Sequence, residues 1–397
     1  METRPPQLHL CPAAWLCLLM LAMVLHAVPA AAHDASAYGG LFRSRSMGGA
    51  WLNADVGLFP SAALAAAVDP RDSNHLLMGT DAGLFASGNG GRSWTQPAPV
   101  LVAGAVFAVA FSPDGAGALC AAPGGVFRAT GGVWRAADAP EGATPARTIL
   151  FGAAPGRVYL LGRDRLYASD DGGARFTRVS GATDDDAGFE ALAIARQPAE
   201  TLFAIRHGRL VVSTDGGRRW QPRPLPVAGA PVDAVSPDPA IPGRLWAASA
   251  DRLFRSEDGG GSWQAVGNPL PEPHTITRGI AADAGATMLV VTTHRGTYRS
   301  TDAGAHWMLE EGNLPIHLEA GPLARDPAAP ATLYAVYSLI PYPEVWRNAV
   351  EGSNLLARAD PMSLIGGAAF LLLLLLAGIA LVAWLLRWRR AIPEAAR

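Results

Sequence analysis

The sequence predicts an all-β fold in which seven repeated units of four strands close into a ring, and three observations lead to this prediction. A turn pattern, S-x-D-x-G-x-x-W, occurs in nearly identical copies at 213–220, 256–263 and 300–307. The aromatic residue that closes this pattern, or a looser copy of it, recurs about every 40 to 44 residues, at positions 51, 94, 134, 176, 220, 263 and 307. A run of alternating apolar and polar residues precedes each turn and is typical of one arm of a hairpin. Since this period is that of a four-stranded blade, we expect a seven-bladed β-propeller.

The chemistry of the turn pattern predicts a structural role for its residues. Asp and Ser side chains bond to nearby backbone N–H groups and hold tight turns, and Gly adopts backbone angles that other residues resist. The aromatic residue begins the next strand and packs between blades. We therefore assign a turn-forming role, not a catalytic or metal-binding one, to Ser169, Asp171, Gly173, Ser213, Asp215, Gly217, Trp220, Ser256, Asp258, Gly260, Trp263, Ser300, Asp302, Gly304 and Trp307.

These motifs resemble the Asp-box, or BNR, repeat of sialidases, sortilin-type receptors, some xyloglucan hydrolases and the photosystem II assembly factor family. The resemblance covers about residues 38 to 357. It implies a propeller whose Asp-box turns lie away from the face that binds ligands. It is specific for architecture and says little about function, because the same repeat serves enzymes, receptors and assembly factors.

Composition excludes several function classes. The chain has 397 residues and a formal net charge of −2, which argues against a nucleic-acid-binding surface. It contains no lysine, so a Walker lysine and a Schiff-base lysine are excluded. No C-x-x-C, H-E-x-x-H or Gly-rich phosphate loop occurs, and we expect no metal and no cofactor. Cys11 and Cys17 lie in a segment expected to be removed, which leaves Cys120 as a buried structural thiol or, alternatively, a reactive one.

The N-terminal residues 1–32 have the features of a signal peptide. Arg4 precedes a mostly apolar run, and the small residues Ala30–Ala32 offer a cleavage site before His33. An uncleaved anchor is the alternative, although the apolar run is short for a membrane span.

The propeller is expected over residues 33–340, with a question about how its ring closes. The first hairpin, at 40–53, has no pair of inner strands before it, while the last inner pair, at 318–337, is followed only by a faint copy of the motif. The economical interpretation is that the N-terminal hairpin completes the last blade, so that 341–362 form a stalk with a vestigial hairpin. The alternative places that last hairpin in the seventh blade and the N-terminal hairpin at its edge.

A transmembrane helix is expected at 363–387. Residues 364–386 are about 23 apolar residues without a charge, long enough to span a bilayer. Arg387, Arg389 and Arg390 follow, which places the short tail 388–397 in the cytoplasm by the positive-inside rule. Together with the signal peptide this predicts a single-pass cell-membrane protein whose propeller is periplasmic or extracellular.

Candidate ligand-binding residues lie in the loops opposite the Asp-box turns, between second and third strands and between blades. The candidates are Arg163, Arg206, His207, Asp251, His294 and Arg295, with Asp81 and Asp164 at similar places. If Arg163, Arg206 and Arg295 converge, they would grip a carboxylate, as the resemblance to sialidases implies. The tyrosine–glutamate pair of that family cannot be placed. The alternative is ordinary solvated loop polarity, which also covers the loop carboxylates Glu141, Asp184–Asp186 and Glu272.

These features favour a membrane-anchored, extracytoplasmic binding or assembly scaffold that does no catalysis and recognises another membrane or envelope protein. The photosystem II assembly factor family is the nearest analogue by repeat type and size. The alternative is a membrane-tethered glycoside hydrolase of sialidase type, or a glycan-binding protein. The expected partners are therefore the membrane and a protein, with a glycan as the alternative ligand and no nucleic acid.

Overall fold

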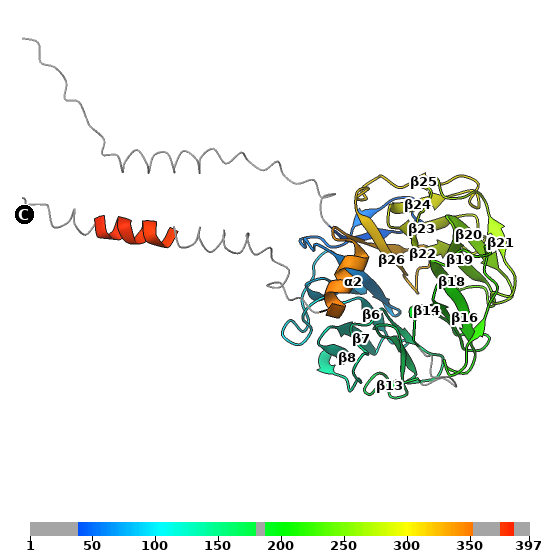
Figure 1. Cartoon of the computed structure of the whole chain (residues 1–397), viewed down its shortest axis with the longest axis horizontal. Helices are drawn as coiled ribbons and strands as arrows, with labels where there is room; N and C mark the ends of the chain where they lie inside the picture. The colour runs from blue at the N-terminus through cyan, green and yellow to red at the C-terminus, as the bar shows by residue number, and fades with distance from the viewer. Residues whose placement is uncertain (1–38, 180–186, 352–373, 385–397) are drawn as a thin grey trace, which may run out of the picture. The chain divides into compact units, whose positions relative to one another are not determined.

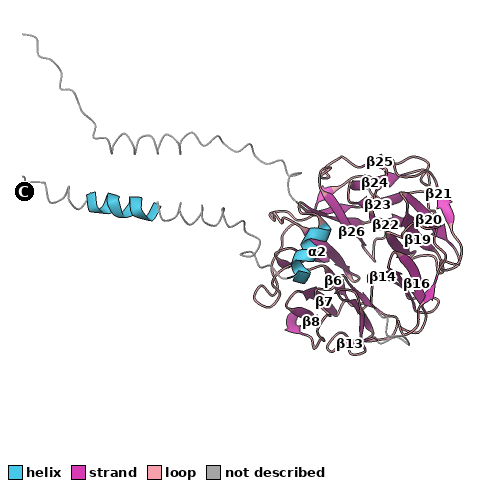
Figure 2. Ribbon diagram, in the orientation of Figure 1, coloured by secondary structure: helices cyan, strands magenta, loops and turns pink. Residues whose placement is uncertain are grey.

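The structure is a computed structural model that describes residues 39–179, 187–351 and 374–384. Two compact units are present, Met1–Val350 and Glu351–Arg397, and every strand that the structure describes lies in the first. Its seven sheets radiate from a common centre as the blades of a propeller (Figure 1). Strands dominate this unit and are joined by turns and loops (Figure 2). The predicted seven-bladed all-β fold is confirmed.

Each blade is an antiparallel meander whose strands run outward in chain order, and the last blade alone is assembled from both ends of the chain. The innermost strands are β3 (Ala63–Asp69), β6 (Ala108–Phe111), β10 (Thr148–Phe151), β14 (Phe189–Ala195), β18 (Ala234–Pro237), β22 (Thr277–Ala282) and β26 (Glu319–Arg325). The second strands are β4 (Asp72–Thr80), β7 (Gly117–Ala122), β11 (Val158–Leu161), β15 (Thr201–Arg206), β19 (Leu245–Ser249), β23 (Leu289–Thr293) and β27 (Leu333–Ser338).

The outer half of each blade follows the same order. The third strands are β5 (Gly83–Ser87), β8 (Gly125–Thr130), β12 (Leu166–Ser169), β16 (Arg209–Ser213), β20 (Arg252–Ser256), β24 (Gly296–Ser300) and β1 (Gly40–Ser44). The outermost are β9 (Val133–Ala136), β13 (Thr177–Arg178), β17 (Gln221–Pro222), β21 (Gln264–Val266), β25 (Met308–Leu309) and β2 (Leu52–Asn53). In the blade of β3, β4 and β5 the fourth strand is reduced to one bridge between Ala86 and Thr95. Pro97 and Pro99 follow Thr95 and cannot donate to a ladder.

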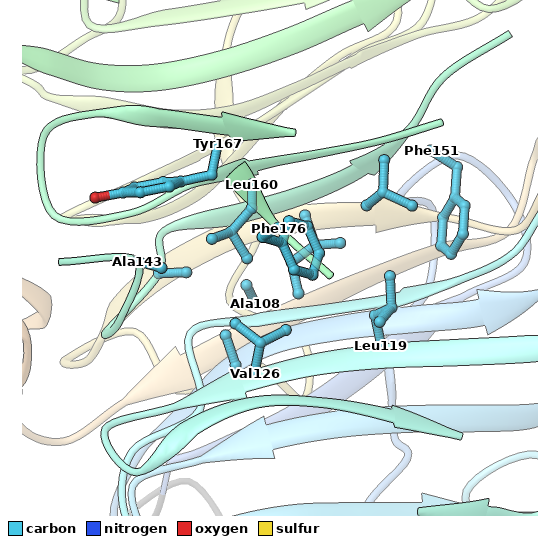
Figure 3. Close-up of a cluster of buried hydrophobic side chains, with 12 residues drawn as sticks. Ala108, Leu119, Val126, Ala143, Phe151, Leu160, Tyr167 and Phe176 are labelled. Atoms are coloured by element: carbon cyan, nitrogen blue, oxygen red, sulfur yellow. The ribbon is translucent and has the colours of Figure 1, made fainter. Parts of the chain in front are cut away.

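The core lies between blades, because each sheet is covered on both faces by its neighbours. The second strand β11, for example, is buried along its whole length. In one such layer Leu119 and Val126 of one blade pack with Leu160 and Phe176 of the next (Figure 3). Burial on both faces explains why a second strand such as β11 is continuously apolar instead of alternating.

The ring is closed by the N-terminal hairpin. The last sheet has the order β2-β1-β27-β26, so β1 and β2 supply its outer strands. Phe42 of β1 stacks edge-on against Tyr337 of β27, with ring centroids 5.3 Å apart. Arg299 in the preceding blade donates from Nε to the Met47 carbonyl at 2.9 Å. Closure in this way completes the last blade, so that only short, protected strand edges remain.

The prediction of a vestigial hairpin within 341–362 is wrong for residues Tyr342–Glu351, because they form helix α2. Apolar residues at 342, 345, 346, 349 and 350 have the period of a helix face, a pattern that outweighs the faint resemblance to the turn motif. Pro341 and Pro343 are compatible with a helix start.

The remaining expectations concern the chain ends. The expected signal 1–32 and tail 388–397 lie outside the described residues, as does most of the expected span 363–387. Residues 374–384 of that span are helical and exposed. Within the described ranges, no helix has the length and apolar character needed to cross a membrane.

Candidate functional site

The propeller has two faces with different roles. One face, called the turn face, carries the turns between first and second strands and the motif turns between third and fourth strands. The other, called the ligand face, carries the turns between second and third strands and the connections between blades. These positions follow from the antiparallel order of the strands in each sheet.

The motif turns are built from side chains that hold backbone. Ser256 accepts a hydrogen bond from the Gly260 N–H at 2.8 Å and donates to Asp258 at 2.7 Å. Asp258 in turn accepts from the Ser262 N–H and hydroxyl. Hydrogen bonds from Ser256 and Ser262 hold the pKa of the Asp258 carboxyl far below its usual range. The pKa values of Asp171, Asp215 and Asp302 are also lowered by such bonds, so these groups stay ionised in turns.

Glycine is required in these turns for two reasons that act together. Gly217 has a φ of 87°, in the left-handed region. A Cβ placed there would lie 2.4 Å from a methyl carbon of Leu166 in the preceding blade. The turn therefore presses its backbone against the neighbouring blade, and a side chain would push the two apart.

The closing tryptophans join adjacent blades. The indole N–H groups of Trp94, Trp263 and Trp307 donate to backbone carbonyls 39 to 40 residues earlier in the chain, at 3.0 to 3.1 Å. Each bond therefore crosses from one blade to the one before it. The turn face is thus occupied by bonds that hold the ring.

On the ligand face, the three candidate arginines are engaged by loops of their own blades. Arg163 donates to the Thr144 carbonyl at 3.2 Å, and Arg206 to the Ala187 carbonyl at 2.8 Å. Arg295 pairs with the Glu272 carboxylate. No contact between any two of these arginines is found in the part of the chain that the structure describes, so the hypothesis of a convergent triad gains no support here.

The other candidates also hold loops. Asp251 accepts the His274 and Thr275 N–H groups at 2.9 and 2.6 Å. His294 Nδ1 accepts the Ile276 N–H at 3.0 Å.

His207, Asp81 and Asp164 lie in the same kind of position. The His207 ring packs on Gly188, where a Cβ would lie 2.1 Å away. Asp81 accepts the Ala62 N–H at 3.2 Å, and Asp164 pairs with Arg165. These bonds shape the connections between blades.

A group that the sequence analysis missed lies at the ligand-face ends of the innermost strands. These strands adjoin one another around the ring, so side chains at their ends face the central axis. We call the following residues the axial mouth: Leu64, Phe107, Arg147, Arg278 and Glu319. In two of their strands the pairing skips a residue, Leu64 in β3 and Arg278 in β22. Such bulges re-aim a side chain, and the bulge is the feature that sequence alone did not reveal.

Helix α2 packs against the axial mouth and lies beside β6 and β26 (Figure 1). Its buried face, formed by Val345 and Trp346, packs against Leu64 and Phe107. The Trp346 ring meets Phe107 edge-on, with centroids 4.9 Å apart. The axial part of the ligand face is therefore already covered by the chain's own helix.

Charged groups surround this contact. Arg278 pairs with Glu319 at 3.3 Å. Beside them Asp233 has a pKa raised to about 6, first by burial and then by the nearby Asp251 carboxylate. A raised acid pKa is a property of catalytic acids, but both oxygens of Asp251 are used by loop N–H groups.

Two further features do not form a reactive centre. Among residues 39–179, 187–351 and 374–384, no group of three His, Cys, Asp or Glu side chains is placed to hold a metal ion. Cys120 is buried, and burial raises the pKa of its thiol.

A cavity of about 500 Å³ opens on the turn face beside Pro113, Phe151 and Arg157. Arg157 is held there by Asp170 at 3.2 Å.

Exposed apolar side chains of the propeller lie mainly in the connections between blades. Seven large apolar residues of the described propeller that are more than a third exposed lie in its loops: Val56, Phe59, Val100, Leu101, Ile276, Ile316 and Leu339. The others lie on outermost strands: Leu52, Val133 and Met308. None lies in a motif turn of the described blades.

No protein-family model matches this chain, and no curated protein matches it. It is similar in structure to YCF48 bound to a D1 peptide, with a TM-score of 0.55 and 16% identity over 70% of this chain and 94% of that one. It is also similar to YCF48 from Cyanidioschyzon merolae, with a TM-score of 0.54 and 14% identity over 71% and 97%. It is similar as well to the extracellular domain of BT4673 from B. thetaiotaomicron, with a TM-score of 0.54 and 14% identity over 70% of this chain and 38% of that one. At these identities the likeness shows the fold alone.

Proposed function

We propose that this protein is a membrane-anchored, extracytoplasmic binding or assembly scaffold that does no catalysis, and that its ligand face docks another membrane or envelope protein. The observation that carries the proposal is the exposure of large apolar side chains in the connections between blades, with Val100 at 96% exposure and Phe59 at 72%. Apolar side chains gathered on one surface mark interaction sites, because water contact is unfavourable for them.

The contrast between the faces supports this assignment. On the turn face, Ser, Asp and Trp side chains form hydrogen bonds within and between blades, as Ser256 and Trp263 do. On the ligand face, polar side chains such as Arg163 and Asp251 hold the loops, and exposed apolar side chains such as Val100 and Ile276 lie in the connections between blades. Ordered loops that expose apolar side chains are suited to binding a protein surface.

The route of the chain also supports a partner near the membrane. The chain leaves β27 on the ligand face, and only residues 352–362 separate α2 from the expected span at 363–387. A partner in the same membrane is thus the economical choice. The similar fold of YCF48 has been seen with a D1 peptide bound, which makes a protein segment a reasonable ligand class for this fold.

The test is site-specific photo-crosslinking of the full-length protein in its native membrane. A photoreactive residue replaces Val100 or Ile276 on the ligand face. Matched controls place it at Val133 on an outermost strand and at Arg218 in a motif turn; all four positions are exposed. We expect one discrete membrane or envelope protein to be captured from both ligand-face positions and from neither control.

Capture of the same proteins at all four positions, or at none, would contradict the scaffold proposal. In the second case, specific retention of the purified protein on a glycan array would favour the glycan-binding alternative. Cleavage of a glycan there would favour the hydrolase instead.

A further inference from the structure

Helix α2 is seated on the axial mouth by one face only. Tyr342, Val345 and Trp346 point to the propeller, while Glu344 and Arg347 are exposed. Burial raises the pKa of the Tyr342 hydroxyl to about 12, so this side chain stays neutral in its seat. The helix therefore presents two aromatic residues four positions apart, which lie on the same side of an α-helix.

Two arginine side chains of the axial mouth contact these two rings. The guanidinium carbon of Arg147 lies 3.9 Å from the Trp346 ring centroid, and that of Arg278 lies 5.4 Å from the Tyr342 ring centroid. An arginine over an aromatic face is attracted by the ring's electron density, more strongly for Trp than for Tyr. The mouth thus carries two aromatic-binding positions at the spacing of a helix turn.

The mouth also recognises the start of a helix. Glu319 Oε2 accepts the Tyr342 backbone N–H at 3.0 Å while holding Arg278 at 3.3 Å. The first N–H groups of any helix lack partners within the helix, and a carboxylate at that end is favourable. This contact depends on backbone, so it would serve another helix as well as α2.

The ring does not need α2 in order to close. The last blade is complete once β26 and β27 pair with the N-terminal hairpin, and the helix follows it in the chain. The helix is an addition laid on a finished ring, over an apolar floor formed by Ala62, Leu64 and Phe107. An amphipathic helix in such a groove is a recurring mode of peptide recognition.

We propose that the axial mouth is a binding site for an amphipathic helix of the partner protein, one with two aromatic residues four positions apart near its N-terminus, and that α2 is the resident occupant which this helix displaces. This inference rests on the proposed scaffold function and names the kind of partner segment. A tethered occupant competes at an effective concentration in the millimolar range. The partner would therefore bind well only when its own helix is presented close by, as on a protein already held by the ligand-face loops.

The test measures binding of a fluorescent peptide with the sequence of residues 341–351 to the full-length protein, by anisotropy. The variant Tyr342→Ala/Trp346→Ala weakens the resident helix and should bind the peptide at least about tenfold more tightly than the wild type, since the tethered competitor is lost. The matched control Glu344→Ala/Arg347→Ala changes exposed positions of the same helix and should bind like the wild type. Adding Arg147→Glu to the first variant should weaken its peptide binding about tenfold or more.

A melting temperature within a few degrees of the wild type establishes that the first variant is folded. If that folded variant fails to bind the peptide, or binds it no better than the wild type does, α2 is a permanent part of the propeller and the inference is wrong. That result would leave the photo-crosslinks from Val100 and Ile276 unchanged. Loss of those crosslinks, in contrast, is the failure of the scaffold proposal itself.

Discussion

The guanidinium carbon of Arg147 lies 3.9 Å from the ring centroid of Trp346, on two segments separated by most of the propeller sequence. Arg147 stands just before an innermost strand, and Trp346 belongs to the helix that follows the last blade. Burial in this contact lowers the pKa of the arginine. The pair shows that the C-terminal end of the described propeller unit is bound to its axis.

Replacing Arg147 should loosen helix α2 without unfolding the ring. In Arg147→Gln the interaction with Trp346 is lost, worth about 0.5–2 kcal/mol. Amide hydrogen exchange over residues 342–351 should then be about 2- to 30-fold faster, while the β11 amides keep their protection. The control Arg347→Gln, at an exposed position of the helix, should leave exchange unchanged. Equal exchange in both variants would show that the ring contact does not hold the helix.

The bond between Trp263 and the preceding blade should be separable from ring packing. Trp263→Phe keeps much of the aromatic surface and loses the N–H donated to the Pro224 carbonyl at 3.1 Å. We expect a loss of about 1 kcal/mol in the free energy of unfolding. Trp263→Ala should cost about 2–3 kcal/mol, less than for a fully buried Trp, because the side chain is half-buried. Equal costs in chemical denaturation would assign the whole effect to the hydrogen bond.

The buried serine of a motif turn should matter more than the exposed one. Ser256→Ala leaves the buried Gly260 N–H without its acceptor, and the expected loss is about 1–3 kcal/mol. Ser262→Ala removes the hydrogen bond that the exposed Ser262 hydroxyl donates to Asp258. This change should cost no more than about 0.5 kcal/mol in the free energy of unfolding. Denaturant midpoints of the two variants decide this. The reverse order would mean that the aspartate, not the serine, organises the turn.

Asp55 should make stability depend on pH. Burial raises its pKa from 3.8 to about 6, although Leu41 donates its N–H to the carboxylate at 3.1 Å. The folded state thus binds this proton more tightly than the unfolded chain does, so stability falls as pH rises from about 4 to 6 and then stays level.

At about 1.4 kcal/mol per pKa unit this amounts to about 3 kcal/mol at most. The unfolding free energy of Asp55→Asn, compared with the wild type, should therefore improve by that order between pH 4 and pH 7. A difference that does not change with pH would contradict the raised pKa.

Closure by the N-terminal hairpin predicts that Phe42 is needed by the whole ring. Its side chain is 4% exposed and stacks on Tyr337. Phe42→Ala should cost about 3–5 kcal/mol and lower the single melting transition of the propeller. Leu52→Ala on the same hairpin, at 59% exposure, is the control and should change little. A local loss of structure confined to the hairpin would mean that the other blades hold together without it.

The repeat-based predictions succeeded where the structure is determined by neighbours in the chain. The turn of Asp258 is made by residues within four positions of it. The spacing of these residues in the sequence therefore determines the geometry of the turn. The hairpin-first closure also followed from counting strands, since an unpaired hairpin at one end matches an incomplete blade at the other.

The functional face was predicted less well. The candidate residues Arg163 and Asp251 do lie on the ligand face, yet both hold loops. The axial mouth was missed because Arg147, Arg278 and Glu319 look like ordinary strand-end residues. The bulge at Arg278 and the closure of the ring bring them together at the axis. Helix α2 was missed because a faint copy of the turn motif was given more weight than a helical period at 342, 345 and 346.

By itself, the sequence determined the repeat, the number of blades, the chemistry of the motif turns and the order of ring closure, because these depend on contacts between residues close in the chain or one period apart. Tertiary structure alone decided which apolar side chains in the connections between blades stay exposed and that α2 packs on the axial mouth. Arg147 and Trp346 are far apart in sequence and share no pattern; they meet because a closed ring brings the starts of all its innermost strands to one axis.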